Sequence, residues 1–134
     1  KTIPAAVVYY SETTLERHQD AMQWIPSLGK EFLQLNPGIK CAEPAYEFCE
    51  YLDGEFREKQ IHIRHNEAVA SRGMESGRIK FREMPETRVI SFYHKAEENG
   101  YQITGPAREC YIDGIWNKDS EEDWLTEIQL PARR

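Results

Sequence analysis

A short motif occurs twice in this chain, and the repetition limits the folds that the chain can adopt. Residues 43–51 and residues 105–113 both contain Pro-Ala-x-Glu, and the matching positions differ by 62. In each copy the motif leads into a segment that has the character of a β-strand. A motif that recurs in this way indicates one supersecondary unit that is used twice.

The segments around the motif repeat as well. A proline-led strand precedes each copy, and a further strand follows each copy after a polar turn; these strands are expected at residues 3–10, 60–64, 84–93 and 127–131. We therefore expect an α+β fold of two duplicated βαββ units in a pseudo-twofold arrangement, with antiparallel sheets around a central ligand cleft. Within a single domain, residues 1–134, the expected parts are a first repeat at about 1–65, a linker at 66–78 and a second repeat at about 79–131.

The first unit contains a helical pattern. Residues 11–14 offer a helix cap, apolar side chains follow at helical spacing from Leu15, and residues 36–38, Asn-Pro-Gly, end the pattern. Pro26 should end or kink this helix, or open a new one. After the helix, Asp53-Gly54 predicts a hairpin between two strands near 45–52 and 59–65.

The second unit is too short for the same helix. Forty positions separate the two prolines that mark the first unit, Pro4 and Pro44, but only 21 separate Pro85 from Pro106. A helical crossover needs a dozen residues or more, and the second unit lacks them. Our hypothesis is that the sequence joins two pieces at about Lys95/Ala96, where a helix has been deleted or left out.

The alternation of side chains along the strands predicts which residues share a face. The second hairpin is expected at 107–112 and 125–131. On one of its faces we expect Cys110, Ile112, Ile128 and Leu130, and on the opposite face Glu109, Tyr111, Glu127 and Gln129. On one face of the first hairpin we expect Phe48, Ile61 and Ile63, and on the opposite face Glu47, Cys49, Gln60 and His62. The apolar face would pack under a helix, and the acidic face would either meet solvent or line the cleft.

Two features favour the cleft over solvent. Glutamate is uncommon in strands, yet Glu47 and Glu109 recur at matched positions. Glu127 is expected on the strand beside Glu109. A partly buried carboxylate pair is costly unless a positive group meets it. An organic cation held by Glu109 and aromatic faces would supply that charge, and each cation–π contact would contribute about 0.5–2 kcal/mol.

Composition excludes several function classes. The net charge of −6 argues against direct binding of nucleic-acid phosphates, and no apolar run approaches the roughly 20 residues that a membrane helix needs. The three cysteines, Cys41, Cys49 and Cys110, lack Cys-x-x-Cys spacing and are expected to be reduced thiols in the cytoplasm.

His62 and His65 are three apart on a strand and so point to opposite faces. We therefore expect no metal site and no cofactor.

An ordered set of short motifs resembles the GyrI-like family of effector-binding domains, also described as the AraC-type bacterial effector-binding domain. The matching stretches are Met-Pro-x-x-Arg-Val at 84–89, His-Lys at 94–95, Glu-Asn-Gly-Tyr at 98–101, Gly-Pro-x-Arg-Glu at 105–109 followed by Tyr111, and Thr-Glu-Ile-Gln-Leu-Pro at 126–131. The resemblance covers essentially the whole chain. It departs after residue 95, where the family usually continues with a Gly-x-Tyr element and a long helix.

This resemblance implies a binding role for the cleft. The family's ligand-contacting glutamate falls on Glu109, a second acidic position on Glu127 and a pocket aromatic on Tyr111. We add Glu47 from the repeat, and Tyr51 and Trp116 as flat apolar surfaces. The expected ligand is a small hydrophobic or cationic molecule, as in multidrug-binding sensors.

The resemblance also leaves the wider role open. Many relatives are the sensor domain of a transcription regulator, so DNA would be contacted through a domain upstream of Lys1, and a homodimer is a further expectation. Others are hydrolases of reactive cyclopropane-type compounds, which would make Glu109 a general base and Tyr111 its catalytic partner. A third group modulates gyrase by protein binding. We favour the non-enzymatic sensor, with the hydrolase as its alternative.

Overall fold

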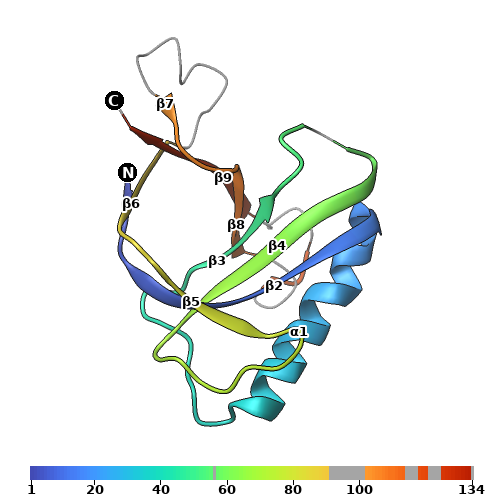
Figure 1. Ribbon diagram of the computed structural model, residues 1–134, viewed down its shortest axis with the longest axis vertical. Helices are drawn as coiled ribbons and strands as arrows, with labels where there is room; N and C mark the ends of the chain where they lie inside the picture. Colours follow the sequence, from blue (N-terminus) through green and yellow to red (C-terminus); the bar gives the residue numbers. More distant parts are fainter. Residues whose placement is uncertain (56, 91–101, 114–117, 121–124, 134) are drawn as a thin grey trace.

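The computed structural model describes residues 1–55, 57–90, 102–113, 118–120 and 125–133. These residues form an α+β fold, in which one long helix packs on a largely antiparallel, curled sheet (Figure 1). The elements are β1 (Thr2–Ile3), β2 (Ala6–Arg17), the 3₁₀-helix η1 (His18–Asp20), α1 (Ala21–Leu35), β3 (Glu47–Tyr51), β4 (Lys59–Val69), β5 (Lys80–Met84), β6 (Thr87–Ile90), β7 (Gln102–Ile103), β8 (Arg108–Asp113) and β9 (Leu125–Arg133).

The order of the strands is symmetric about its centre once each strand of one half is matched with its counterpart in the other half. It runs β1-β6-β9-β8-β3-β4-β2-β5, and β7 adds to β9 outside this path. In the first half the strands β2, β3 and β4 take the positions that β6, β8 and β9 take in the second half. The two halves meet where β3 pairs with β8, and there Phe48 lies directly opposite Cys110, its counterpart at the offset of 62.

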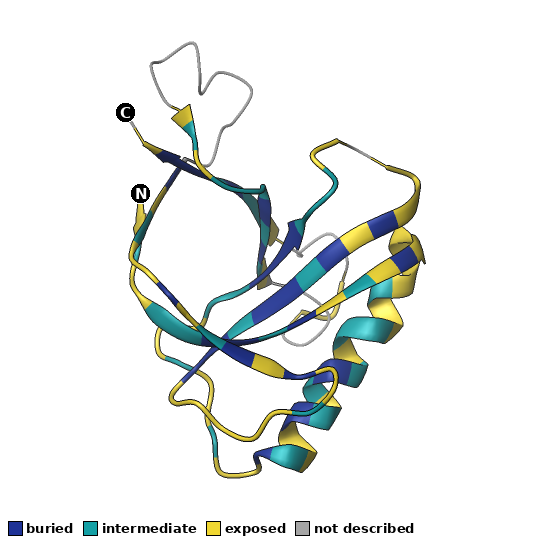
Figure 2. Ribbon diagram, viewed as in Figure 1, coloured by how far each residue is buried: buried dark blue, intermediate teal, exposed yellow. Residues whose placement is uncertain are grey.

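The described part of the chain holds a single α-helix, which covers one face of the first half (Figure 2). Leu28 and Phe32 of α1 are buried against Tyr9, Val69 and Phe81. Tyr9 and Phe32 stack with their ring centroids 4.3 Å apart. A second cluster, Leu15, Cys49, Ile61 and Ile63, lies under the first half of the helix, where Trp24 and Ile25 pack on it.

The start of the helix differs from the sequence expectation. Residues 11–14 continue β2 instead of capping a helix, and the strand runs on to Arg17. Ser11 pairs with His65 and Leu15 with Ile61, so long-range pairing with β4 outweighs the local cap signal. Pro26 lies inside α1, which continues to Leu35 rather than ending there.

The predicted distribution of side chains between the two faces of the sheet is wrong. Residues directly opposite each other in antiparallel strands share a face. Cys110 lies opposite Glu127, and Glu109 lies opposite Ile128. Glu109 and Glu127 are therefore on opposite faces. The prediction assumed a register one residue away, and such a slip moves every side chain of a strand to the other face.

The first hairpin departs from the prediction in the same way. Tyr51 lies opposite Ile63, and Cys49 lies opposite His65, so these four share the face that carries α1. Phe48 points to the other face, where it joins a separate core cluster of Val8, Ala68, Met84 and Cys110. Strand β4 also continues to Val69, which places residues 66–69 of the expected linker inside the sheet.

Several expectations fall outside the described residues. These are the proposed junction at Lys95/Ala96, the strand residues 91–93 and the loop residue Trp116.

Both predicted hairpins are confirmed as pairs of adjacent antiparallel strands, β3 with β4 and β8 with β9. Within the described ranges, no helix is both long enough and apolar enough to cross a membrane.

Candidate functional site

Glu109 lies between two tyrosines on the α1 face of the sheet. The Tyr51 hydroxyl donates a hydrogen bond of 2.8 Å to Glu109 Oε2, and the Tyr111 hydroxyl donates one of 3.3 Å to the same oxygen. Tyr51 comes from β3, whereas Glu109 and Tyr111 come from β8, two residues apart. The seam between the two halves of the sheet thus brings these three predicted site residues together.

The two phenols act as neutral donors. Burial raises the pKa of Tyr51, and the charge of Glu109 raises it further. Burial is also the main reason that the pKa of Tyr111 is raised. The neighbouring thiol of Cys49 is fully buried, and burial raises its pKa to about 12. A thiol with such a pKa stays protonated at neutral pH, so Cys49 is unsuited to nucleophilic chemistry.

Glu109 forms part of the wall of a cavity of about 650 Å³. Much of the rest of the wall is apolar, and it comes from both halves of the sheet. The remaining lining residues include Tyr51, Ile61, Ile103, Pro106, Ile128 and Leu130, with His18, Asp53, Glu55 and Arg57 among the polar members. Ligand pockets commonly have this composition, an apolar wall with a few polar groups.

The carboxylate of Glu109 has no cationic partner in the described part of the chain. None of the ion pairs there includes Glu109. Glu50 shows what the same fold does with a structural carboxylate. It is 3% exposed and lies 2.8 Å from Arg82 Nη2 and 3.4 Å from Arg64 Nη1. The fold thus supplies arginines to a buried acid elsewhere, whereas the described partners of Glu109 are two tyrosines.

Two of the other predicted site residues lie elsewhere. Glu127 is on the opposite face, where its carboxylate is 2.9 Å from Lys1 Nζ beside a second cavity of about 410 Å³. Glu47 shares the face of Glu109, but its Oε1 is 2.8 Å from Nε2 of His65. Trp116 is outside the described residues. The predicted acidic pair Glu109–Glu127 is thus not a structural pair.

Comparison with solved structures identifies the family. The crystal structure of the EcmrR C-terminal domain matches with a TM-score of 0.88 and 34% sequence identity, over 100% of this chain and 95% of that one. This chain belongs to the family of the EcmrR C-terminal domain. In a cryo-electron microscopy structure of an EcmrR–DNA complex, EcmrR matches with a TM-score of 0.90 and 33% identity, and this chain covers 56% of that chain.

A solved structure with much lower sequence identity supports the fold alone. A hydrolase from Listeria innocua matches with a TM-score of 0.57 at 11% identity, over 99% of this chain and 91% of that one. No protein-family model and no curated protein sequence matches the chain. The finer assignment of this EcmrR-type domain to the GyrI-like family therefore stays a prediction.

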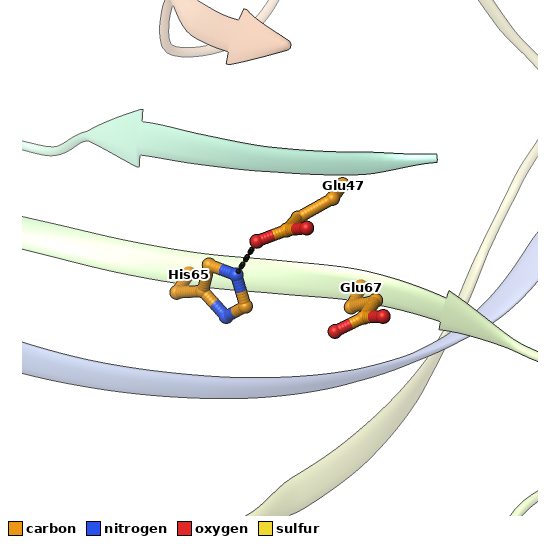
Figure 3. A group of neighbouring side chains, drawn as sticks. All are labelled: Glu47, His65 and Glu67. Carbon is orange, nitrogen blue, oxygen red and sulfur yellow. Dashed lines mark hydrogen bonds and ion pairs between the residues drawn. The ribbon is translucent and has the colours of Figure 1, made fainter. Parts of the chain in front are cut away.

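Sequence reasoning missed one group of side chains in this EcmrR-type domain. His65 and Glu67 of β4 lie beside Glu47 of β3, and the three project from neighbouring strands into one small region (Figure 3). His62 and His65 do lie on opposite faces, as expected. The spacing of His65 and Glu67, two apart on one strand, was the signal that could have found them, because such residues share a face.

Proposed function

We propose that this chain is the ligand-binding domain of a DNA-binding regulator and that it binds a hydrophobic or aromatic monocation at Glu109. One observation carries the proposal: Glu109 forms part of the wall of a cavity of about 650 Å³, and its carboxylate accepts hydrogen bonds from two tyrosine hydroxyls but pairs with no cation among the residues that the structure describes. The volume lies within the roughly 300–1,000 Å³ range that is usual for small-molecule pockets.

The charge of the ligand follows from desolvation. A ligand that fills the cavity removes water from Glu109, and an ionised carboxylate that loses water needs a compensating charge. The two hydroxyl bonds offset part of that cost, since a carboxylate has about four acceptor positions. A cationic ligand would supply the missing charge, while Tyr51 and the apolar wall would contact its hydrophobic groups.

The wider role rests on the family. EcmrR is described in complex with DNA, and this chain corresponds to 56% of the EcmrR chain. The net charge of −6 is unfavourable for phosphate binding. We therefore assign DNA contact to a part of the full regulator outside these residues, and ligand sensing to this domain.

The experiment compares two ions of the same size and shape. Tetraphenylphosphonium carries one positive charge and tetraphenylborate one negative charge, so isothermal titration of both separates charge from hydrophobic contact. We expect the phosphonium to bind and the borate to bind at least tenfold more weakly. Equal affinities for the two ions, or no saturable binding of the cation, would refute the proposal.

The hydrolase alternative depends on the contact of 3.3 Å between Tyr111 and Glu109, which would let the carboxylate act as a base beside a hydroxyl donor. The same protein preparation tests it. Turnover of a reactive cyclopropane substrate that disappears in Glu109→Gln would favour the hydrolase. Saturable cation binding without turnover would favour the sensor.

A further inference from the structure

Glu47, His65 and Glu67 form a cluster next to the Glu109 site but separate from it. Each offers one donor atom, and these atoms all lie within 4.8 Å of one another (Figure 3). Glu47 and Glu67 are directly opposite each other on β3 and β4. A fourth group, the thiol of Cys41, has its Sγ 3.1 Å from Glu67 Oε1.

This cluster is short of positive charge. Like charges directly opposite each other on antiparallel strands are destabilising. In the described part of the chain, neither Glu47 nor Glu67 forms an ion pair with lysine or arginine, and His65 is the single basic group that contacts Glu47. Glu67 accepts from neutral donors, the Tyr9 hydroxyl at 2.7 Å and the Cys41 thiol.

We propose that this cluster is a binding site for a divalent transition-metal ion of the zinc class, with Glu47, His65 and Glu67 as ligands and Cys41 as the fourth. The donor set decides the class of ion. Imidazole, carboxylate and thiolate groups together suit Zn²⁺, whereas Mg²⁺ prefers sites made of oxygen alone. Tyr9 would hold Glu67 in position through its hydroxyl, as a second layer of bonds commonly does around metal ligands.

The geometry is close to what such an ion requires. Zinc binds nitrogen and oxygen at about 2.0–2.2 Å, which places its ligand atoms roughly 3–4 Å apart. Rotations that bring the outermost donors of Glu47, His65 and Glu67 about 1 Å closer would suit the ion. The side chain of Cys41, whose Sγ is not within 4.8 Å of all three donors, would also have to turn toward it. His65 is 1% exposed and lies against the rings of Tyr9 and Trp24, so its imidazole is held in place. Cys41 is exposed, which leaves a path for the ion.

Binding would change the protonation of the cluster. The nitrogen of His65 that now contacts Glu47 would have to offer its lone pair, and the thiol of Cys41 would have to lose its proton. With the Nε2 lone pair on the ion, the imidazole of His65 would carry its proton on Nδ1, which is buried and has no hydrogen-bond partner among the described residues. The charge of the ion would offset the repulsion between the two carboxylates.

The test is isothermal titration of the chelator-treated domain with ZnCl₂ and, as the hard-ion comparison, with MgCl₂. We expect one Zn²⁺ per chain with a dissociation constant in the micromolar range or below, and at least tenfold weaker binding of Mg²⁺. Glu67→Gln should weaken Zn²⁺ at least tenfold. The controls His62→Gln and Glu83→Gln remove an exposed histidine and an exposed carboxylate outside the cluster. They should leave the affinity for Zn²⁺ unchanged.

A second readout identifies the ligands directly and does not depend on Glu67→Gln folding. Co²⁺ in place of Zn²⁺ should give the intense visible bands of tetrahedral coordination, together with a thiolate charge-transfer band. Cys41→Ser, at an exposed position, should lose the charge-transfer band and keep the visible bands. Absence of stoichiometric binding, or binding that His62→Gln lowers as much as Glu67→Gln, would overturn the proposal.

Discussion

Glu47 and Glu109 occupy the same position in the two copies of the motif, yet their surroundings differ. Both lie on the α1 face, and both accept a hydrogen bond from a side chain on the neighbouring strand, His65 for Glu47 and Tyr51 for Glu109. Glu47 has a second carboxylate opposite it, whereas Glu109 lines an open cavity. The matched positions of the motif therefore have similar backbone placement, while the neighbouring side chains decide what each acid can bind.

The largest expected effect tests the seam that places both acids. Phe48 and Cys110 are repeat counterparts that face each other, and Phe48 is fully buried beneath the guanidinium of Arg108, at 4.9 Å from the ring centroid. Phe48→Ala should lower the free energy of unfolding by about 3–5 kcal/mol, because a large cavity replaces the ring. Urea denaturation measures it. Cys110→Ala removes much less volume and should cost about 1 kcal/mol or less; equal losses would contradict a seam packed around Phe48.

A smaller effect separates the two acids by ligand. Glu109→Gln should weaken tetraphenylphosphonium binding at least tenfold, which corresponds to about 1.4 kcal/mol, because it removes the charge that the cation meets. Glu127→Gln, on the opposite face, is the matched control and should leave the affinity unchanged. Glu47→Gln should also have little effect. If Glu47→Gln and Glu109→Gln weakened binding alike, the two acids would belong to one site.

The two tyrosines allow a finer comparison around Glu109. Tyr51 donates the shorter bond, 2.8 Å against 3.3 Å for Tyr111. Each Tyr→Phe change removes one donor to a charged acceptor, and we expect Tyr51→Phe to cost about 1 kcal/mol of stability and Tyr111→Phe less. Urea denaturation at neutral pH gives both values. The reverse order would show that the Tyr111 bond is the stronger one.

The smallest effect concerns the thiol beside the Glu47 cluster. Partial desolvation, and then the hydrogen bond to Glu67, raise the pKa of Cys41 to about 11. Because the thiolate is the reactive form, alkylation of metal-free protein at pH 8 should be slow for an exposed cysteine and should accelerate as the pH rises toward 11. Glu67→Gln should speed the reaction several-fold at pH 8. An unchanged rate would show that the carboxylate does not act on the thiol.

Local patterns predicted the pairings of this fold better than its registers. Asp53-Gly54 indicated the first hairpin, and the repeat indicated that β8 and β9 form the second. The register between β8 and β9 decides which face each side chain takes. It includes a register shift between Tyr111 and Asp113, which no local sequence pattern reveals. The predicted start of the helix is wrong for a similar reason, because residues 11–14 pair with β4, which is distant in the sequence.

The candidate site was predictable in part. Glu109, Tyr51 and Tyr111 were all named from the sequence, and the structure brings them into contact. Glu127 was assigned to them through the wrong register. His65 and Glu67 were overlooked because His65 was compared with His62, rather than with Glu67 two residues further along the same strand and with Glu47 on the adjacent strand.

The outermost strands are exchanged between the two halves. Strand β1, at the start of the expected first repeat, pairs with β6 of the expected second repeat, and β5, at the start of the second, pairs with β2 of the first. Each half therefore closes the edge of the other. Severing the chain between β4 and β5 would leave two fragments with exposed strand edges, and they should regain their structure by reassembling with each other rather than separately.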